Sequence, residues 1–160
     1  PCVVDADGLN LLSAHSRYMK NLVRGQFIFT PHMKEMSRIT RKSVEELRNS
    51  RMEILKQFAG EYDVTCVLKD ARTCIFSPGE HPFVNLSGNA AMAKAGSGDV
   101  LAGVITGLLA QKMSCFDAAV LGVYLHGLAG DEAKREKGSY SVLARDLAEN
   151  IGTVLKRLEE

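Results

Sequence analysis

Hydrophobic residues fall along the chain into short continuous runs, which are separated by longer segments with helical spacing. The runs lie near residues 2–5, 27–30, 64–69 and 73–77. Continuous apolar runs, in place of strict alternation, are typical of strands that are buried on both faces of a sheet. Only a few residues separate the last two runs, so we expect these two strands to form a hairpin.

The segments between the runs carry the start signals of helices. Thr30 followed by Pro31 is typical of an N-cap with proline at the first helical position, which makes His32 the second helical residue. Ser43 and Glu46 have the spacing of a capping box. Hydrophobic positions then recur with helical periodicity, at Val44, Leu47, Ile54, Leu55 and Phe58.

The second half of the chain predicts a block of helices. Residues 98–109 carry no charge after Asp99, which is typical of a helix that is buried nearly all round. Ser114 caps a second helix that runs to about Glu136, and we expect residues 131–137 to form its solvated charged face. One or two amphipathic helices follow. Strand, helix, strand, hairpin and then helices is the order of a layered α/β domain.

Length and charge limit the classes of function. The chain of 160 residues is long enough for a single domain, residues 1–160, and 20 Lys and Arg against 19 Asp and Glu give a net charge of +1. This balance argues against a nucleic-acid binder and against a polybasic membrane binder. No apolar run reaches the roughly 18 residues of a membrane span. The chain starts with Pro1 instead of Met, so we expect its N-terminal part to be missing.

The cysteines indicate a reducing compartment. Cys2, Cys66, Cys74 and Cys115 are scattered and lack the spacing of a metal site. We expect reduced, buried thiols in a cytoplasmic protein, because a domain of this size needs no disulfide. A bridge between Cys66 and Cys74 across the hairpin is the alternative.

Candidate chemistry is concentrated in residues 85–100, where small side chains allow a close approach of the backbone. The turn from Ala95 to Gly98 leads directly into the uncharged helix, whose free N–H groups and dipole form an anion site. In phosphoryl transfer the backbone of such a site holds the transferring group, and the Asp99 carboxylate is placed to accept the proton of the attacking hydroxyl. Alternatively, Asp99 only favours the helix N-terminus electrostatically. A P-loop and the third glycine of a dinucleotide fingerprint are both absent.

Five motifs follow one another along nearly the whole chain. They are VDADGLN at 4–10, TPHMKE at 30–35, VLKDART at 67–73, GSGDVLAG at 96–103 and YLHGLAGD at 124–131. In this order they resemble the nucleotide-dependent NAD(P)H-hydrate dehydratases. The resemblance implies a three-layer α/β/α, ribokinase-like sheet that here lacks its N-terminal part.

The resemblance implies repair of damaged cofactor. Hydrated NADH or NADPH would lose water through phosphoryl transfer to its hydroxyl and expulsion of phosphate, with ADP or ATP as the donor and Mg2+ accompanying the nucleotide. A small-molecule kinase of the same superfamily is the alternative, and a non-catalytic nucleotide-binding module is a third possibility. As partners the resemblance implies the hydrate, the nucleotide, and either a homo-oligomer or the missing N-terminal segment.

The resemblance also implies roles for individual residues. Asp99 is the expected catalytic residue, and Asp99, His32 and Glu35 are the expected binding residues for the hydrate. The expected nucleotide-binding residues are Lys69, Asp70, Ala71, Arg72, Thr73, Gly96, Ser97 and Gly98. No metal ligand of the protein is expected. Asp70 departs from the glycine of bacterial relatives, and Asp tolerates a left-handed backbone better than most residues.

Other interpretations of single residues stay open. Without the neighbouring motifs Lys69 could be an ordinary surface lysine at a hairpin turn. His126 lies in the middle of a helix among apolar residues, so we interpret it as structural. Asp5 and Asp7 follow a strand, which is a common place for functional loops in α/β sheets, but the sequence identifies no partner for either.

Overall fold

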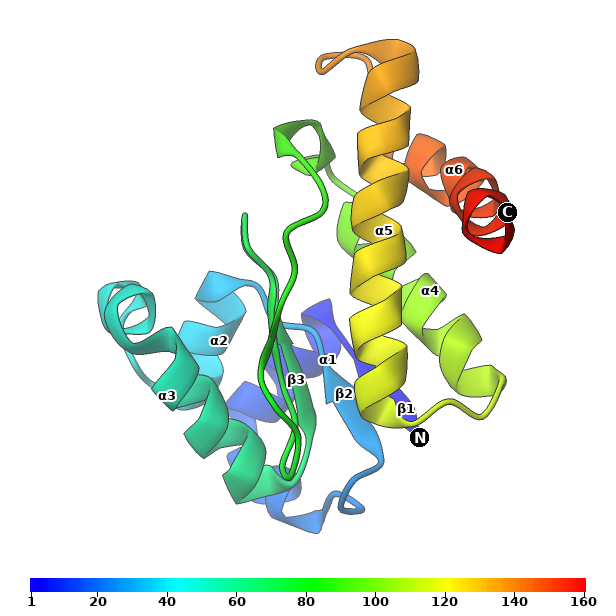
Figure 1. Cartoon of the computed structure of the whole chain (residues 1–160). Helices are drawn as coiled ribbons and strands as arrows, with labels where there is room; N and C mark the ends of the chain where they lie inside the picture. The colour runs from blue at the N-terminus through cyan, green and yellow to red at the C-terminus, as the bar shows by residue number, and fades with distance from the viewer.

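Five strands form one mixed sheet in the computed structural model, which describes residues 1–160 (Figure 1). In spatial order they are β1 (Cys2–Val4), β2 (Phe27–Phe29), β3 (Thr65–Leu68), β4 (Cys74–Phe76) and β5 (Phe83–Val84). β1, β2 and β3 are parallel, whereas β4 is antiparallel to both of its neighbours. The expected hairpin is confirmed. β5 was not predicted, because two residues are too few to produce a pattern.

Helices cover both faces of the sheet (Figure 1). The first layer holds α1 (Ala6–Ala14), the short 3-10 helix η1 (Ser16–Asn21), α2 (Met33–Thr40) and α3 (Val44–Tyr62). The second layer holds α4 (Ser97–Ala110), α5 (Cys115–Lys137) and α6 (Ala144–Glu159), and a 3-10 turn, η2 (Ala90–Met92), precedes it in sequence. Within the second layer α6 packs on α5. The expected three-layer α/β/α architecture is therefore confirmed.

Successive strand residues point into two separate hydrophobic cores. Phe29 and Cys66 belong to the core shared with α1, α2 and α3, whereas Ile28, Val67 and Ile75 belong to the core shared with α4 and α5. All five side chains are fully buried. Burial of a large apolar side chain contributes about 1.5–3 kcal/mol. The prediction that the strands are buried on both faces is confirmed for β2, β3 and β4 but is wrong for β1, an edge strand that is exposed at Cys2 and only partly buried at Val3 and Val4.

The four cysteines are free, but the expected burial holds only for Cys66 and Cys74, because Cys2 is exposed and Cys115 is partly buried. The register of the hairpin pairs Leu68 with Cys74 and Cys66 with Phe76, so the two buried cysteines do not face each other across it. Burial raises the pKa of the Cys66 thiol and that of the Cys74 thiol above the usual range. Both are therefore protonated and unreactive at neutral pH, as expected of structural thiols.

The start of α2 differs from the expectation. Thr30 is not the N-cap, because it continues β2 and its N–H donates to the carbonyl of Val4 at 3.1 Å. The N-cap is His32, whose Nδ1 accepts hydrogen bonds from the backbone N–H groups of Lys34 and Glu35. Pairing along the sheet thus overrides the local threonine–proline signal.

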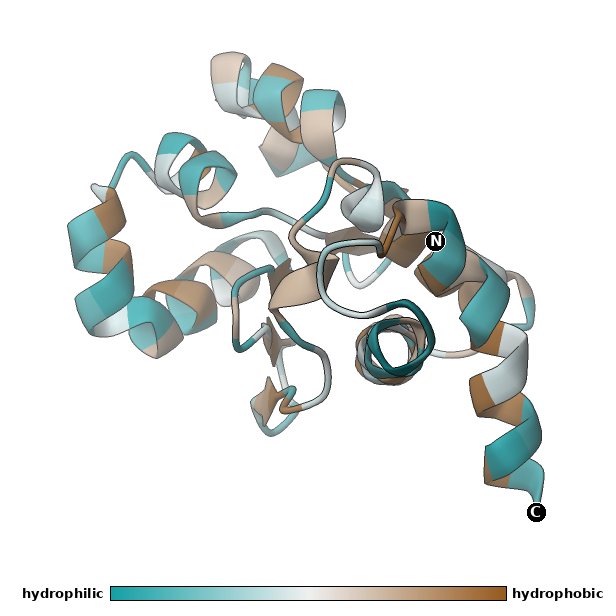
Figure 2. Ribbon diagram, turned by 90° about the horizontal axis from the view of Figure 1, so that it is seen from above, coloured by the Kyte–Doolittle hydropathy of each residue, from teal (hydrophilic) through white to brown (hydrophobic).

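The other helix starts follow the sequence signals. Ser43 caps α3 and forms the expected capping box with Glu46. Ser114 caps α5, which ends at Lys137, one residue beyond the expected end. The C-terminal segment forms one helix, α6, along which hydrophobic and hydrophilic residues alternate (Figure 2). None of the helices combines the length and the apolar character that a membrane crossing requires.

The burial of α4 was predicted wrongly. Only Ser97, Leu101, Ile105 and Leu109 are buried, and the other positions of the helix are partly or fully exposed. The helix lies in an outer layer, where one stripe packs on the sheet and on α5 and the opposite side stays open. Absence of charge therefore did not indicate burial all round.

Candidate active site

The three parallel strands end at the same edge of the sheet, and predicted site residues follow each of them. Asp5 follows β1, His32 lies three residues beyond β2, and Lys69 follows β3. The backbone N–H of Lys69 donates to the carbonyl of Pro31 at 2.8 Å, which holds the last two segments together. In doubly wound sheets ligands bind outside the carboxyl ends of the strands.

Asp5 and Lys69 form an ion pair at this edge. Lys69 Nζ lies 2.6 Å from Asp5 Oδ1, and the two side chains are only 20% and 14% exposed. The interpretation of Lys69 as a surface lysine is therefore wrong. Asp7, in contrast, is exposed in the first turn of α1 and makes no ion pair. Sequence alone could not separate the two aspartates, because Lys69 is 64 residues away from Asp5.

The N-terminus of α4 reaches this ion pair. A Cβ atom on Gly98 would lie 3.4 Å from Lys69 Nζ and 3.7 Å from Asp5 Oδ2, so the backbone and the charges are in close contact. The N-cap, Gly96, has a φ of 87°, a left-handed conformation that favours glycine.

Two backbone donors of this turn are free. The N–H groups of Gly98 and Asp99 donate to no group in the protein, whereas the N–H of Ser97 donates to the carbonyl of Lys94. The Ser97 hydroxyl donates to the carbonyl of Met92 at 2.7 Å and so braces the turn. Free N–H groups at a helix N-terminus beside a lysine form an anion site. The Asp99 carboxylate is exposed and unpaired, one residue from Gly98.

The loop after β3 is held by its own hydrogen bonds. Asp70 accepts from the N–H of Ala71 at 2.9 Å, and the Thr73 hydroxyl donates to the carbonyl of Asp70 at 3.3 Å. No residue between 69 and 73 has a positive φ, so Asp70 does not need the left-handed tolerance that we invoked. Its negative charge faces Arg51 at 3.5 Å, which offsets repulsion of an anionic ligand.

A cavity of about 760 Å³ joins the loop and the helix N-terminus. The predicted nucleotide-binding residues all line it except Gly96, and so does His32. Glu35 and Asp99 do not. The charged residues among those that line the cavity are three cations and one carboxylate: Lys69, Asp70, Arg72 and Lys94. The excess positive charge suits a phosphate-bearing ligand.

Another part of the cavity wall comes from residues 85–94, the first part of the stretch in which the sequence concentrated candidate chemistry, although no residue of this part was among the predicted site residues. It consists of Asn85, Ser87, Gly88, Asn89, Ala90, Met92, Ala93 and Lys94. The Asp131 carboxylate on α5 holds this wall, because it accepts from the N–H of Gly88 at 2.9 Å and from Asn89 Nδ2 at 2.8 Å. Our interpretation of residues 131–137 as a merely solvated face is therefore wrong.

The same charged segment contains a second structural carboxylate. Glu132 is only 6% exposed and pairs with Arg135 on its own helix and with Arg157 on α6. The hydrogen bonds from Arg157 and Arg135 lower the pKa of Glu132 to about 2. Glu132 is therefore ionised throughout the physiological range and ties α6 to α5.

His32 and Glu35 cap α2 together. While His32 Nδ1 accepts two backbone hydrogen bonds, Glu35 Oε2 accepts from the N–H of His32 at 2.9 Å. Glu35 is 6% exposed and lies behind the histidine. His32 thus reaches the cavity directly, whereas any influence of Glu35 on a ligand passes through His32.

His126 was not expected at the site, because its position among apolar helix residues indicated a structural role. It lines the cavity from α5, and its Nε2 is the only buried side-chain nitrogen or oxygen without a hydrogen-bond partner. Burial lowers the pKa of His126 to about 4; the Ser97 backbone opposes this effect, and the nearby Lys69 cation adds to it. The imidazole is therefore neutral at pH 7.

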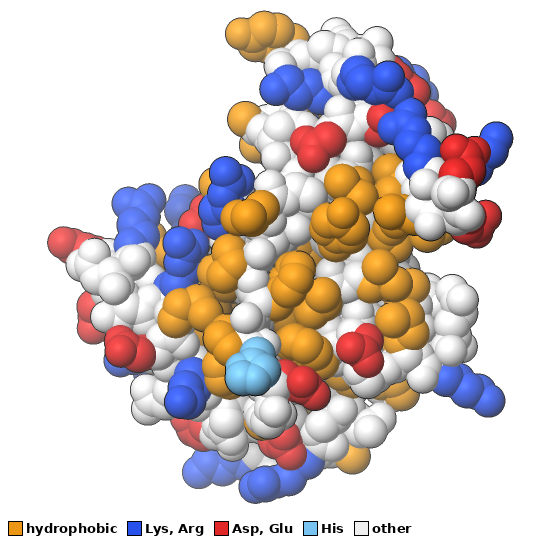
Figure 3. Space-filling view, in the orientation of Figure 1, with side chains coloured by type: hydrophobic (Ala, Val, Ile, Leu, Met, Phe, Trp, Pro, Cys, Tyr) orange, Lys and Arg blue, Asp and Glu red, His pale blue; other side chains and the backbone are white.

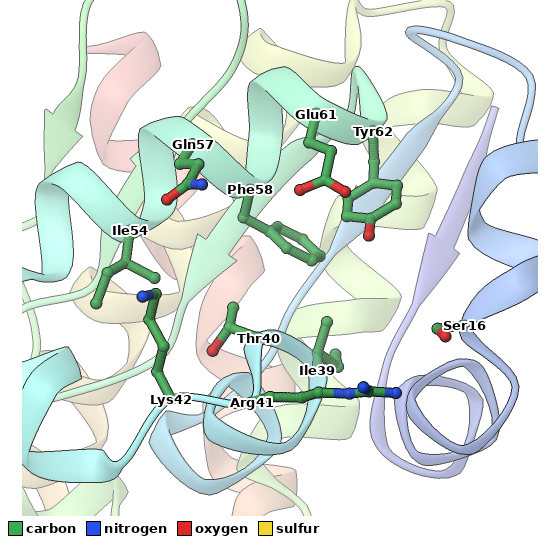
Figure 4. A pocket seen from close by; sticks show the side chains of 10 residues that line it. All are labelled: Ser16, Ile39, Thr40, Arg41, Lys42, Ile54, Gln57, Phe58, Glu61 and Tyr62. Carbon is green, nitrogen blue, oxygen red and sulfur yellow. The ribbon is translucent and has the colours of Figure 1, made fainter.

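A smaller cavity of about 300 Å³ lies apart from this edge, between α2 and α3 (Figure 4). It contains none of the predicted site residues, and its side chains include Arg41, Lys42, Phe58 and Tyr62. No group of three or more His, Cys, Asp or Glu side chains in the molecule is arranged to hold a metal ion.

The layered sheet and the basic cavity at its carboxyl edge define a three-layer α/β/α protein with a site suited to a phosphate-bearing ligand. Residues 1–153 match the family model described as NAD(P)H-hydrate dehydratase, so the chain belongs to this family. The resemblance of the five motifs is thereby confirmed.

Individual relatives agree with this assignment. The chain is 43% identical over 160 residues to a bifunctional NAD(P)H-hydrate repair enzyme of Moorella thermoacetica, and covers 100% of itself and 30% of that protein. It is 35% identical over 159 residues to an ADP-dependent (S)-NAD(P)H-hydrate dehydratase of Bacillus subtilis, and covers 99% of itself and 55% of that protein. The chain thus spans about half the length, or less, of these curated relatives.

Solved structures show the same fold. The ADP/ATP-dependent NAD(P)H-hydrate dehydratase from Bacillus subtilis, co-crystallized with ATP and Mg2+, superposes with a TM-score of 0.84 at 32% identity, over 97% of this chain and 54% of that one. A ribokinase-like superfamily protein from Enterococcus faecalis gives 0.80 at 33% identity, over 97% and 52%. The ribokinase-like fold is therefore confirmed.

Proposed function

We propose that this chain carries the active site for nucleotide-dependent dehydration of hydrated NADH or NADPH. Its relatives from Neisseria meningitidis and Bacillus subtilis are ADP-dependent (S)-NAD(P)H-hydrate dehydratases. The observation that carries the proposal is the grouping of Lys69, the free N–H groups of Gly98 and Asp99, and the unpaired Asp99 carboxylate around one helix N-terminus. This grouping offers an anion site and a base within one turn of helix.

The reaction balances without a redox partner. Asp99 accepts the proton of the hydrate hydroxyl, and the hydroxyl oxygen attacks the terminal phosphorus of ADP or ATP, which releases AMP or ADP. The C–O bond of the phosphorylated hydrate then breaks, inorganic phosphate leaves with the hydrate oxygen, and the neighbouring carbon loses a proton as the ring double bond returns. Positioning and charge stabilisation provide most of the rate enhancement in phosphoryl transfer.

Each predicted residue has a role in this proposal. Lys69 and the N–H groups of Gly98 and Asp99 stabilise the transferred phosphoryl group. The loop of residues 69–73 and the segment from Asn85 to Lys94 enclose the nucleotide, and His32 faces the hydrate with Glu35 as its positioning residue. The Asp5 carboxylate holds the Lys69 ammonium in place.

Mg2+ fits this site as a companion of the nucleotide. Magnesium is usually held by one or two carboxylates together with substrate phosphates. Because Asp99 accepts the proton in this proposal, the nucleotide phosphates and water would hold the ion without a side chain of the protein, and the ion would neutralise charge on the phosphates. The four free cysteines support a reducing, cytoplasmic location for the reaction.

We also propose that part of the surface is covered in the active enzyme, by a second copy of the chain or by a segment outside these 160 residues. Hydrophobic side chains gather on the face that shows α5 and the strands (Figure 3). Leu86 is 72% exposed and Tyr124 39%, and the hydrogen bond from the Ser87 hydroxyl to the carbonyl of Tyr124 brings the two chain segments together. Sedimentation of the chain tests this proposal, and a monodisperse, active monomer would contradict it.

Isotope tracing tests the proposed reaction. Hydrate prepared in ¹⁸O-labelled water carries the label in its hydroxyl, and the proposed route delivers this label to inorganic phosphate while the absorbance of the reduced nicotinamide returns. A kinase would retain the label in a stable phosphorylated product. Unlabelled phosphate formed alongside restored NADH or NADPH would refute phosphoryl transfer to the hydroxyl.

A further inference from the structure

His126 stands out from every other buried polar side chain of the molecule. It is 8% exposed, and the buried Nε2 atom has no hydrogen-bond partner. An unpaired polar atom in the interior forfeits its bonds to water without replacement. A leucine at this position of α5 would fill the same space without that loss, so packing alone does not account for a histidine.

The position of His126 connects the orphan nitrogen to the cavity. The imidazole forms part of the wall, which Leu101 also lines, and it lies close to the backbone of Ser97 and to the Lys69 cation. Nε2 itself is covered, and rotation about the Cβ–Cγ bond is the smallest movement that presents it to a ligand. The intrinsic wells of this torsion are broad in histidine, so only the atoms packed around the ring oppose the rotation.

The chemistry of a neutral imidazole indicates which part of the nucleotide it contacts. It carries one N–H donor and one lone pair, which match the amino and ring nitrogens at the edge of a purine. The charged phosphates are already served by Lys69 and by the N–H groups of Gly98 and Asp99. Ala90, Met92 and Leu101 provide apolar surface for a flat base in the same cavity.

We infer that Nε2 of His126 hydrogen-bonds the adenine base of the nucleotide and so contributes to the choice of nucleotide. The inference rests on the proposed nucleotide-dependent function and adds a specificity residue to it. His126 is thereby a ligand-contacting residue, in contrast to the structural role that the sequence favoured.

Calorimetric titration of the full-length protein with two probes tests this inference. For His126→Leu we expect the dissociation constant of ADP to rise about tenfold, equivalent to about 1.4 kcal/mol, and that of pyrophosphate to stay unchanged. Lys69→Ala is the matched control and should weaken both ligands. The melting temperature of His126→Leu should equal or exceed that of the wild type, because the variant removes an unpaired buried nitrogen.

Two results would overturn the inference alone: unchanged ADP affinity in His126→Leu, or an equal loss for ADP and pyrophosphate. A wild-type protein that binds no ADP would overturn the proposed function as well, so the two failures are distinguishable. Nitrogen-15 NMR provides a second test that needs no variant. ADP should shift the Nε2 resonance of His126 and pyrophosphate should not, and an unmoved resonance with ADP bound would refute the contact.

Discussion

The ion pair between Asp5 and Lys69 should couple the stability of the fold to the site. Asp5→Asn keeps the size of the side chain and removes its charge, while Lys69→Met keeps the apolar stem and removes the ammonium. Either single variant leaves the other residue with an unpaired charge that is largely buried, because the side chains of Asp5 and Lys69 are only 14% and 20% exposed. The double variant leaves neither charge, so its loss of stability should be smaller than the sum of the two single losses.

The structure sets the size of this coupling. Breaking a fully buried ion pair costs about 3–5 kcal/mol, and a hydrogen bond to a charged group contributes about 1.5–3 kcal/mol. The separation of 2.6 Å is short, but both side chains retain some contact with solvent. We therefore expect each single variant to lose about 2–3 kcal/mol of unfolding free energy, with a coupling of about 2 kcal/mol.

Urea denaturation of the wild type, both single variants and the double variant measures this coupling by linear extrapolation. The ion pair between Arg51 and Asp70 is the control from the same chain, because its atoms are 3.5 Å apart and its side chains are 34% and 41% exposed. Its coupling should stay below about 1 kcal/mol. Additive losses for Asp5 and Lys69, within about 0.5 kcal/mol, would show that they do not act as a pair.

Three further predictions concern the base, the cavity wall and the acid limit. Asp99→Asn should lower turnover of the full-length enzyme by about 10²–10⁴-fold with little change in nucleotide affinity, and wild-type turnover would remove Asp99 as the base. Gly127→Ala places a Cβ 2.0 Å from Ser87 Oγ and should lower the unfolding free energy by about 1–3 kcal/mol. Gly107→Ala is the control, because its Cβ meets open space, and it should stabilise α4 by up to about 1 kcal/mol. The pKa of Glu132 is lowered to about 2 in the folded chain, so its contribution to the unfolding free energy is present above the unfolded pKa and is lost as pH falls from about 5 towards 2. The melting temperature of Glu132→Gln should therefore depend less on pH in this window than that of the wild type. The same dependence of melting temperature on pH in both proteins would contradict the assignment.

Much of this protein was determined by its sequence within short windows. Continuous apolar runs marked four of the five strands, and in β2, β3 and β4 they reflect burial on both faces, which needs apolar side chains at every position. Ser43 and Ser114 marked the starts of α3 and α5, because capping hydrogen bonds join residues only two or three positions apart. The turn from Ala95 to Gly98 indicated an anion site, because the free N–H groups and the dipole of the following helix also depend only on neighbours in sequence.

Tertiary structure decided what depends on partners far apart in the chain. The sheet drew Thr30 into β2 and passed the cap of α2 to His32. The fold paired Asp5 with Lys69 across 64 residues. It also turned His126 towards the cavity and left one side of α4 open. Hydrogen bonds between neighbours in sequence can be read from spacing, whereas burial and charge pairing between distant elements exist only once the layers have packed.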